Sequence, residues 1–313
     1  MPASVDPKDF QIEPYGLSSD CMMILIALVT VVLFASVLYV AKKRGVLCVD
    51  GKFRPIKYVF TQLKTNRNTI LAVVNKDFVG RYNNCYFGVL WNILFPVFLV
   101  VAIYVVFIGV KNIYPDREYW TYICSGLFIV AICRQALGGH SLRSNGATIR
   151  KLPNPIWSIM LADTISKFLS CIIPFSILLV FMAARGNPIS SISLGYTIIM
   201  LLILFVFCFG LTMVTSIMTV LAGDARQIIS TIGRLMVWVS PIFFYICDCK
   251  DSLYDLVMYN PFTYIVEPFH QAISYGNVPD FFMIVTALLC ALFFVAAGFA
   301  LYIMKADRIR ELV

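Results

Sequence analysis

Hydrophobic and polar residues follow one another along this chain in long blocks. Each apolar block after residue 86 is close to the ~20 residues that an α-helix needs to cross a bilayer. These blocks are residues 87–110, 120–137, 156–184, 194–221, 227–246 and 281–304. Another apolar block, at residues 21–41, lies near the N-terminus. The pattern predicts an all-α polytopic membrane protein with an N-terminal transmembrane anchor and about six further spans.

Residues 66–84 have a different pattern and precede the first long span. Their apolar side chains fall close to one helical face: Ile70, Leu71, Val74, Phe78 and Tyr82. Most other positions are polar, and several are cationic. This periodicity predicts an amphipathic interface helix that lies flat on a membrane surface carrying anionic lipid and turns into the bilayer at residues 85–88. Pro96 predicts a kink in the span that follows.

Composition supports the membrane interpretation. The chain is 60% hydrophobic and only 13% charged, which is too few charges to cover the surface of a soluble protein of 313 residues. The formal net charge of +8 would suit nucleic acid in a soluble protein. In an apolar chain it indicates instead the cytoplasmic excess of Lys and Arg that membrane proteins carry, so no nucleic-acid partner is expected.

The position of the charges predicts the topology. Residues 1–20 form an acidic polar tail, and Lys42, Lys43 and Arg44 follow the anchor directly. Residues 42–65 are a basic linker, and basic residues again follow the span 281–304. By the positive-inside rule we expect a multi-pass protein of the plasma membrane, with its N-terminus outside and its C-terminus in the cytoplasm.

Residues 256–275 are apolar but interrupted. They contain Asn260-Pro261, Glu267-Pro268 and His270, which make a full crossing improbable. We expect a pair of short re-entrant helices that enter from the outer face, with their broken backbone buried in protein.

Four stretches resemble the membrane subunit of ABC-2 type exporters, specifically the polysaccharide, teichoic-acid and O-antigen permeases. They are residues 76–96 with Gly88, Trp91 and Pro96, residues 149–155, residues 224–242 with Ser240-Pro241-Ile242, and residues 259–267. The resemblance covers residues 66–313 and implies a six-helix ABC-2 core with an amphipathic interface helix and an external re-entrant pair. The N-terminal anchor departs from the simplest members of the family.

The resemblance also implies the partners and the activity. It implies a homodimer with two copies of a separate ABC ATP-binding subunit, which would hold ATP and Mg, while this chain binds no cofactor. The expected activity is export of a lipid-linked polysaccharide (O-antigen, teichoic acid or a similar cell-surface glycan) across the cytoplasmic membrane. The alternative within the same class is export of a hydrophobic drug or a small lipid.

A basic loop and a short turn are candidates for ATPase coupling. The loop at residues 138–155 joins two spans and can transmit a push to both, and a shorter turn lies at residues 223–227. The candidate residues are His140, Arg143, Arg150, Lys151, Asp224 and Arg226. The alternative is an ordinary basic loop that obeys the positive-inside rule.

Charged residues near membrane depth are candidates for binding a lipid phosphate at a lateral gate, because such charges are expensive to keep there. The charged candidates are Arg81, Arg134, Lys167 and Arg234, and Tyr82, next to Arg81, is an uncharged candidate at the same gate. The alternatives are that Arg134 and Lys167 extend to the nearby interface, or that Lys167 pairs with Asp163 four residues earlier.

Aromatic side chains stack on the C–H faces of sugars, so Trp238, Phe243 and Tyr264 are candidates for a glycan pore. Their alternative is the aromatic belt and ordinary lipid contact.

The sequence supports no catalytic or metal site. Cys247 and Cys249 lack the further ligands of a zinc site, and Glu267 with His270 is too small a set. A membrane-embedded glycosyl or phosphoryl transferase would need clustered acids or a His base, whereas the acids here are scattered.

Overall fold

The computed structural model describes residues 17–45, 48–49, 52–82, 119–139, 141–151, 155–184, 190–249 and 251–312, with a few isolated positions between 83 and 118. Most of the predicted tail at 1–20, the turn at 85–88 and almost all of the predicted span 87–110 lie outside the described residues.

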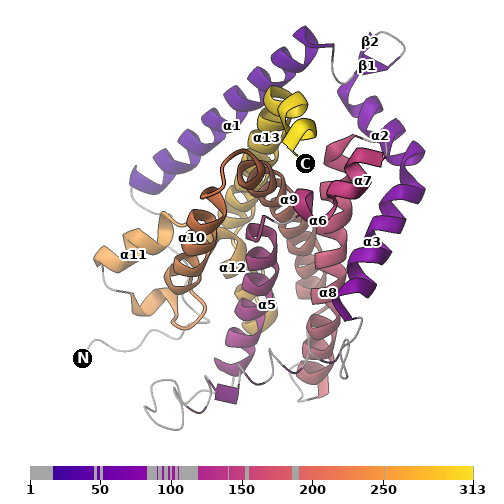
Figure 1. Cartoon of the computed structure of the whole chain (residues 1–313). Helices are drawn as coiled ribbons and strands as arrows, with labels where there is room; N and C mark the ends of the chain where they lie inside the picture. The colour runs from indigo at the N-terminus through magenta and orange to yellow at the C-terminus, as the bar shows by residue number, and fades with distance from the viewer. Residues whose placement is uncertain are drawn as a thin grey trace.

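Long apolar helices dominate the described part of the chain (Figure 1). They are α1 (Leu17–Lys43), α5 (Tyr119–Leu137), α8 (Ile156–Ala184), α9 (Ser191–Leu221) and α13 (Phe281–Leu312). Four described segments are long and apolar enough to cross a bilayer, and α5 is a shorter apolar helix. The prediction of an all-α polytopic membrane protein is confirmed. The only described strands, β1 (Cys48–Val49) and β2 (Lys52–Phe53), form a small antiparallel hairpin.

α9 and α13 pack together along much of their length, and glycine allows the close contact. A Cβ atom on Gly210 of α9 would lie 2.5 Å from the backbone nitrogen of Val295 in α13. A Cβ atom on Gly298 of α13 would lie 2.6 Å from Cβ of Met213 in α9. Without hydrophobic driving force in lipid, such close backbone packing is a main source of helix association.

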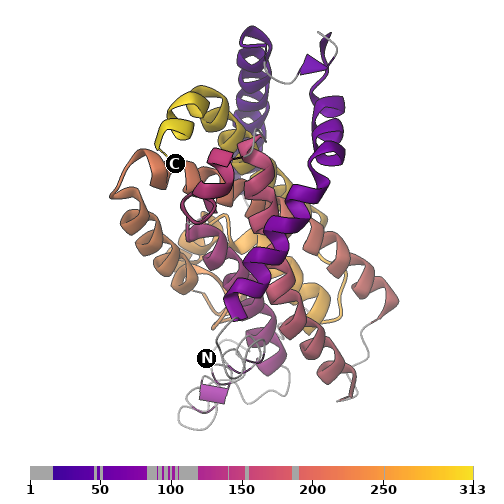
Figure 2. The ribbon, with the colours of Figure 1, turned by 45° about the vertical axis from the view of Figure 1, so that its right-hand side comes forward.

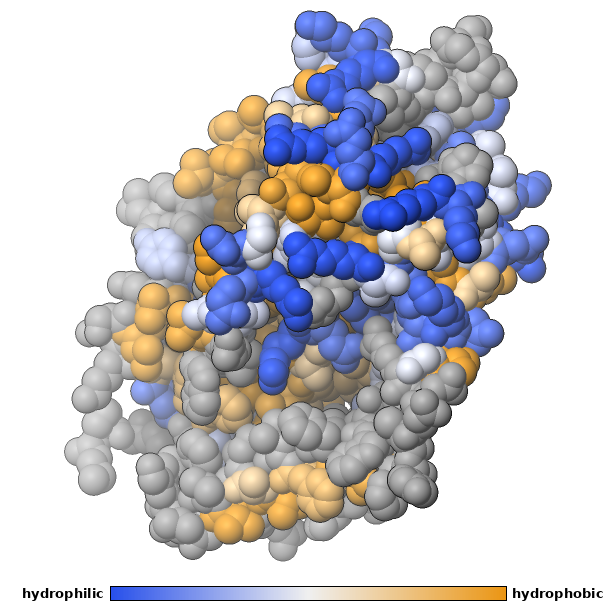
Figure 3. Space-filling model, viewed as in Figure 1, coloured by the Kyte–Doolittle hydropathy of each residue, from blue (hydrophilic) through white to orange (hydrophobic). Residues whose placement is uncertain are grey.

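The described apolar core has a large cluster and a smaller one, and α1 and α13 form a third with Val37, Ala41 and Ile303. The large cluster joins α5, α8, α9, α13 and the segment around residue 265, with Ile129, Phe207 and Phe269 fully buried. The smaller one includes Met160 and Ile309 and lies where α9 and α13 end. We call this the basic end of the bundle, because exposed Lys and Arg residues surround it and hydrophilic side chains gather over the upper part of Figure 3.

The region predicted as a linker contains a helix. α2 (Pro55–Thr65) has Pro55 in its first turn, and Asn66 separates it from α3 (Arg67–Tyr82). Proline suits this position because the first-turn N–H groups have no helical partner. α3 corresponds to the predicted interface helix and packs along α8 (Figure 2).

The buried face of α3 shares Ile70 and Val74 with the predicted apolar face. Ile70, Val73 and Val74 are buried, whereas Leu71, predicted on the apolar face, is 54% exposed. Successive residues of a helix lie 100° apart, so Ile70 and Leu71 cannot both face α8 directly.

The predicted span at 227–246 is helical over a shorter range. α10 covers Ala225–Val239, and the chain then turns at Ser240-Pro241 before the 3-10 helix η3 (Ile246–Asp248). Pro241 has no N–H to continue the helical ladder, which explains the early end.

The predicted re-entrant segment consists of short helices. They are α11 (Asp251–Met258), α12 (Thr263–Phe269) and the π-helical turn η4 (His270–Ser274). Asn260-Pro261 separates α11 from α12, and the Asn260 side chain accepts from the Phe262 N–H at 3.1 Å. Its Nδ2 donates to Ser240 Oγ at 3.0 Å, which joins this turn to the end of α10.

Candidate functional site

The segment between α5 and α8 forms two short helices at the basic end, α6 (Ser141–Ser144) and α7 (Gly146–Lys151). Gly139 precedes them with φ +62°, a left-handed conformation that favours glycine and ends α5. A Cβ atom there would also lie 2.7 Å from Thr219 Cγ2 of α9. The chain therefore leaves α5 by a tight turn against α9.

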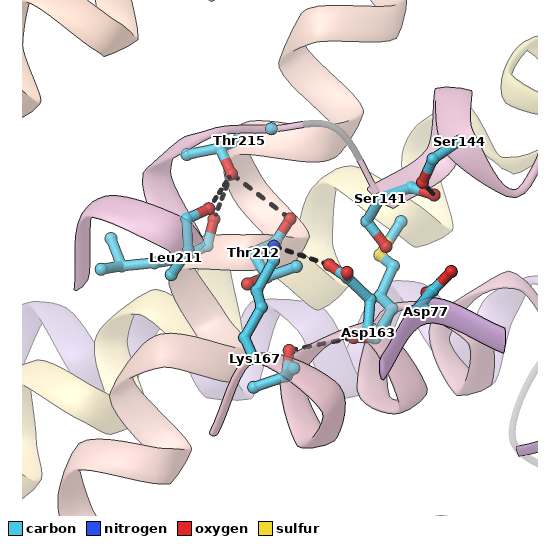
Figure 4. A network of polar contacts seen from close by, with 12 residues as sticks. Asp77, Ser141, Ser144, Asp163, Lys167, Leu211, Thr212 and Thr215 are labelled. Carbon is cyan, nitrogen blue, oxygen red and sulfur yellow. Dashed lines mark hydrogen bonds and ion pairs between the residues drawn. The ribbon is translucent and has the colours of Figure 1, made fainter. Parts of the chain in front are cut away.

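Asn145, between α6 and α7, connects this segment to α3. Its Oδ1 accepts from Lys76 Nζ at 2.9 Å, and its Nδ2 donates to Asp77 Oδ2 at 3.3 Å. The same Nδ2 donates to the Ser141 carbonyl at 3.2 Å, so one buried amide fixes α6 against α3. Figure 4 shows Asp77 of α3 on the side of Ser141 and Ser144 of α6.

A second set of contacts connects the segment to α9. Arg143 Nη2 donates to the Thr219 carbonyl at 2.8 Å, and the Thr219 hydroxyl donates to the Gly139 carbonyl at 2.8 Å. One turn earlier, the Thr215 hydroxyl donates to the Ala136 carbonyl at 3.0 Å. The segment is thus fixed both to α3 and to α9, and a displacement of α6 would act on both helices.

The predicted coupling residues are mostly exposed at this end. Arg143, Arg150 and Lys151 are exposed on α6 and α7, and Asp224 and Arg226 are exposed at the turn between α9 and α10. His140 lies outside the described residues. The sequence analysis selected His140 and charged residues but missed Asn145, whose only signal is that it is a polar residue between two short helices.

Asp163 and Lys167 form an ion pair inside the bundle. Lys167 Nζ lies 2.6 Å from Asp163 Oδ2, and their side chains are only 9% and 8% exposed. Figure 4 shows the pair facing Thr212 of α9. The two charged residues lie four positions apart on α8 and pair with each other. This is the alternative to headgroup binding that the sequence analysis left open for Lys167.

The other predicted headgroup residues lie elsewhere. Arg134 is exposed on α5 and lines a small groove with Leu137 and with Gly233 of α10; Lys167 is not among the lining residues. The side chains of Arg81, Tyr82 and Arg234 are outside the described part of the structure. Of the five residues that the sequence grouped, Lys167 pairs with Asp163 inside the bundle, whereas Arg134 is exposed.

A polar cluster surrounds the chain where α10 ends, at the opposite end from α6. The Tyr122 hydroxyl lies 2.9 Å from the Pro241 carbonyl and 2.9 Å from the Phe244 carbonyl. The Tyr119 hydroxyl donates to the Phe243 carbonyl at 2.8 Å. Backbone carbonyls freed by the helix end thus accept from α5 side chains, as an apolar environment requires.

His270 completes this cluster from η4. Its Nε2 lies 3.0 Å from the Pro241 oxygen, and its Nδ1 lies 2.9 Å from Ser125 Oγ. The imidazole stacks on the Tyr122 ring with centroids 3.7 Å apart. Gly126 makes room, since a Cβ atom there would lie 3.1 Å from His270 Cε1. The cluster therefore joins α5, the end of α10 and η4.

The residues predicted to line a glycan pore differ from one another in their burial. Tyr264 is 3% exposed and packs in the large apolar cluster, and Phe243 is half-buried at its edge. The Trp238 side chain lies outside the described residues. Tyr119 and Tyr122, which the sequence analysis did not select, make the polar contacts here. The only feature of the sequence that could have indicated them is the occurrence of two tyrosines three residues apart.

The chemistry available at these sites is structural and electrostatic. Among the described residues, no group of three or more His, Cys, Asp or Glu side chains is placed to hold a metal ion. Burial, and then the Asp248 carboxylate, raise the pKa of Cys247 and Cys249 to about 11. Both are therefore thiols at neutral pH, which are weaker metal ligands than thiolates.

Comparison with known proteins identifies the family. Residues 68–274 match the ABC-2 type transporter family, a range that includes α3, the coupling segment and the cluster around His270. The chain is also similar to two O-antigen export system permease proteins RfbA of Klebsiella pneumoniae. One is 23% identical over 66% of this chain and 80% of the relative, and the other 22% identical over 67% and 81%. The chain belongs to the ABC-2 type transporter family, and it is a multi-pass transmembrane subunit of an ABC transporter.

Proposed function

We propose that this chain is the transmembrane half of an ATP-driven exporter that moves a lipid-linked polysaccharide outward across the cytoplasmic membrane. The names of the two similar permeases support the choice of a cell-surface glycan as cargo. In this proposal the basic end is cytoplasmic, the N-terminus lies outside, and two copies of the chain enclose the transport path.

The observation that carries the mechanism is the double attachment of the segment 141–151. Asn145 joins it to α3, and Arg143 with Thr219 joins it to α9. A separate ATP-binding subunit that docks on the exposed Arg150 and Lys151 would displace α6 and α7 together. Because hydrogen-bonded elements move as a unit, that displacement would reach the membrane helices directly.

The substrate path follows from the same elements. α3 packs on α8 at the basic end and leads into the span predicted at 87–110, so the two would border a lateral entrance for the lipid carrier. ATP and Mg would be held on the partner subunit, and its closure would open the path between the two copies.

Reconstitution tests this proposal. The full chain is co-expressed with the candidate ATP-binding subunit, purified, and placed in vesicles containing a lipid-linked glycan. We expect stable association of the two proteins and appearance of the glycan on the far side only with ATP and Mg. Failure of the two to co-purify would refute the coupling mechanism. Transport of a small hydrophobic compound without glycan transport would favour the alternative cargo.

A further inference from the structure

We propose that α2, together with the first turn of α3, is a binding surface for the headgroups of anionic phospholipids. α2 precedes the family match at residues 68–274, and the first turn of α3 lies where that match begins. The proposal concerns the surrounding bilayer and does not depend on the identity of the exported molecule.

The charge of this segment is entirely of one sign. No acidic residue occurs between Asp50 and Asp77, whereas the cations in that range are Lys52, Arg54, Lys57, Lys64, Arg67 and Lys76. The side chains of Arg54, Lys57, Lys64 and Arg67 are exposed. Clusters of Lys and Arg next to a transmembrane helix attract the negative surface of a leaflet that contains anionic lipid.

The apolar residues of α2 are arranged for an interface. Val59 and Leu63 pack against the smaller core cluster, and Tyr58 packs against a cluster formed by α1 and α13. Phe60, in contrast, is 69% exposed and lies in the sequence between Lys57 and Lys64. A large apolar side chain among cations is typical of helices that lie at the boundary of headgroups and acyl chains.

The packing of Tyr58 places α2 at headgroup depth. It contacts the cluster of Val37, Ala41 and Ile303, which are in the last apolar turns of α1 and α13. Lys42 follows Ala41 directly, and Lys305 follows Ile303 by two residues, so both helices leave the hydrocarbon at this level. α2 lies near the ends of α1 and α13 in both views (Figures 1 and 2).

These observations favour a bilayer over an acidic protein surface. A protein partner would explain the charges, but it would not explain why the cations lie at the depth where α1 and α13 leave the membrane, with Phe60 exposed among them. Phosphate groups of lipid are the anions found at that depth.

Lysine footprinting on the whole chain tests the surface. The protein is placed in nanodiscs of phosphatidylcholine alone or of phosphatidylcholine with phosphatidylglycerol, and its lysines are acetylated and quantified by mass spectrometry. We expect Lys57 and Lys64 to react several-fold more slowly when phosphatidylglycerol is present. High salt should remove much of this protection, because it screens exposed charges. Lys151, on the coupling segment, should be protected much less and serves as the internal reference.

A matched pair of variants separates local binding from net charge. Arg54→Glu with Arg67→Glu keeps both reporter lysines and should abolish most of their protection. Arg308→Glu with Arg310→Glu makes the same charge change on exposed residues of α13 and should leave it intact. Equal acetylation in both lipid compositions would overturn the proposal. Protection that appears only after an ATP-binding subunit is added would overturn it too and would assign α2 to a protein contact.

Discussion

His270 Nε2 and the carbonyl oxygen of Pro241 lie 3.0 Å apart, so a side chain of η4 satisfies a backbone group freed where α10 ends. A carbonyl only accepts, and Nε2 therefore carries the hydrogen. The Tyr122 hydroxyl points at the same oxygen from α5. The turn after α10 is thus held by α5 on one side and by η4 on the other, and its geometry depends on both.

Replacing His270 tests this relationship. His270→Phe keeps a ring that can stack on Tyr122 but removes both polar contacts of the imidazole, while the Tyr122 hydroxyl can still donate to the Pro241 oxygen. We therefore expect a loss of ~1 kcal/mol in the free energy of unfolding, the net contribution of a typical hydrogen bond. Thermal unfolding of the purified chain in detergent measures it. Tyr259→Phe removes a tyrosine hydroxyl from an exposed side chain nearby in sequence and should change little. An unchanged midpoint for His270→Phe would show that the bond contributes no stability.

The sequence predicted the long helices well, for a physical reason. Residues 120–137 and 156–184 were expected to span, and the structure has Tyr119–Leu137 and Ile156–Ala184. A run of apolar residues in lipid has few alternatives to a helix of the same length, because its backbone groups must be satisfied internally. The sequence also contains Pro241 within the predicted span 227–246. Whether the helix would end there depended on which side chains could donate hydrogen bonds to the carbonyls beyond it, and the sequence does not show those partners.

The contacts of the candidate sites could not be predicted, because they join residues far apart in the sequence. Asn145 meets Lys76 and Asp77, and His270 meets Ser125, and nothing local to either residue marks these pairings. α2 was missed for another reason. Its cations made the region resemble a linker, while Pro55 in the first turn and Val59 and Leu63 at helical spacing were the available signal.

Asn145→Ala should separate partner binding from coupling. It removes the bonds to α3 while leaving Arg150 and Lys151 exposed for docking. We expect roughly tenfold lower transport per ATP hydrolysed, the effect of losing ~1.4 kcal/mol of coupling free energy, with unchanged co-purification of the ATP-binding subunit. Asn75→Ala, an exposed neighbour on α3, is the control. Equal coupling ratios in the two variants would contradict the proposed path.

Gly210→Ala should weaken the contact between α9 and α13. The added methyl would lie 2.5 Å from the Val295 backbone nitrogen, so the helices must move apart. Overpacking of this kind costs ~1–3 kcal/mol of stability. Gly195→Ala makes the same change on α9 with nothing within 4 Å of the new atom, and it should be neutral or slightly stabilising. Unfolding in a denaturing detergent compares the two, and equal midpoints would show that this crossing adapts without cost.

The Asp163–Lys167 pair should be far more sensitive to losing one partner than to losing both. Asp163→Asn leaves the Lys167 ammonium buried without its counter-charge, and we expect a loss of ~3–5 kcal/mol. Asp163→Asn combined with Lys167→Met removes the charge altogether and should recover most of that loss. A double-mutant cycle of unfolding free energies measures the coupling. Additive effects of the single substitutions would show that the two side chains act independently.

Thiol labelling tests the proposed orientation together with the raised pKa values. Cys247 and Cys249 follow the end of α10 and should react with a membrane-impermeant maleimide added outside intact cells, whereas a cysteine introduced by Lys151→Cys, at an exposed position of the basic end, should react only after permeabilisation. The thiolate is the reactive form, and burial with Asp248 raises both pKa values to about 11. Labelling of these two residues should therefore be slow at pH 7. Its rate should increase about tenfold for each unit by which the pH rises, until the pH reaches that pKa. Labelling of the Lys151→Cys variant at its new cysteine, but not at Cys249, in intact cells would reverse the topology, because the basic end would then face outward.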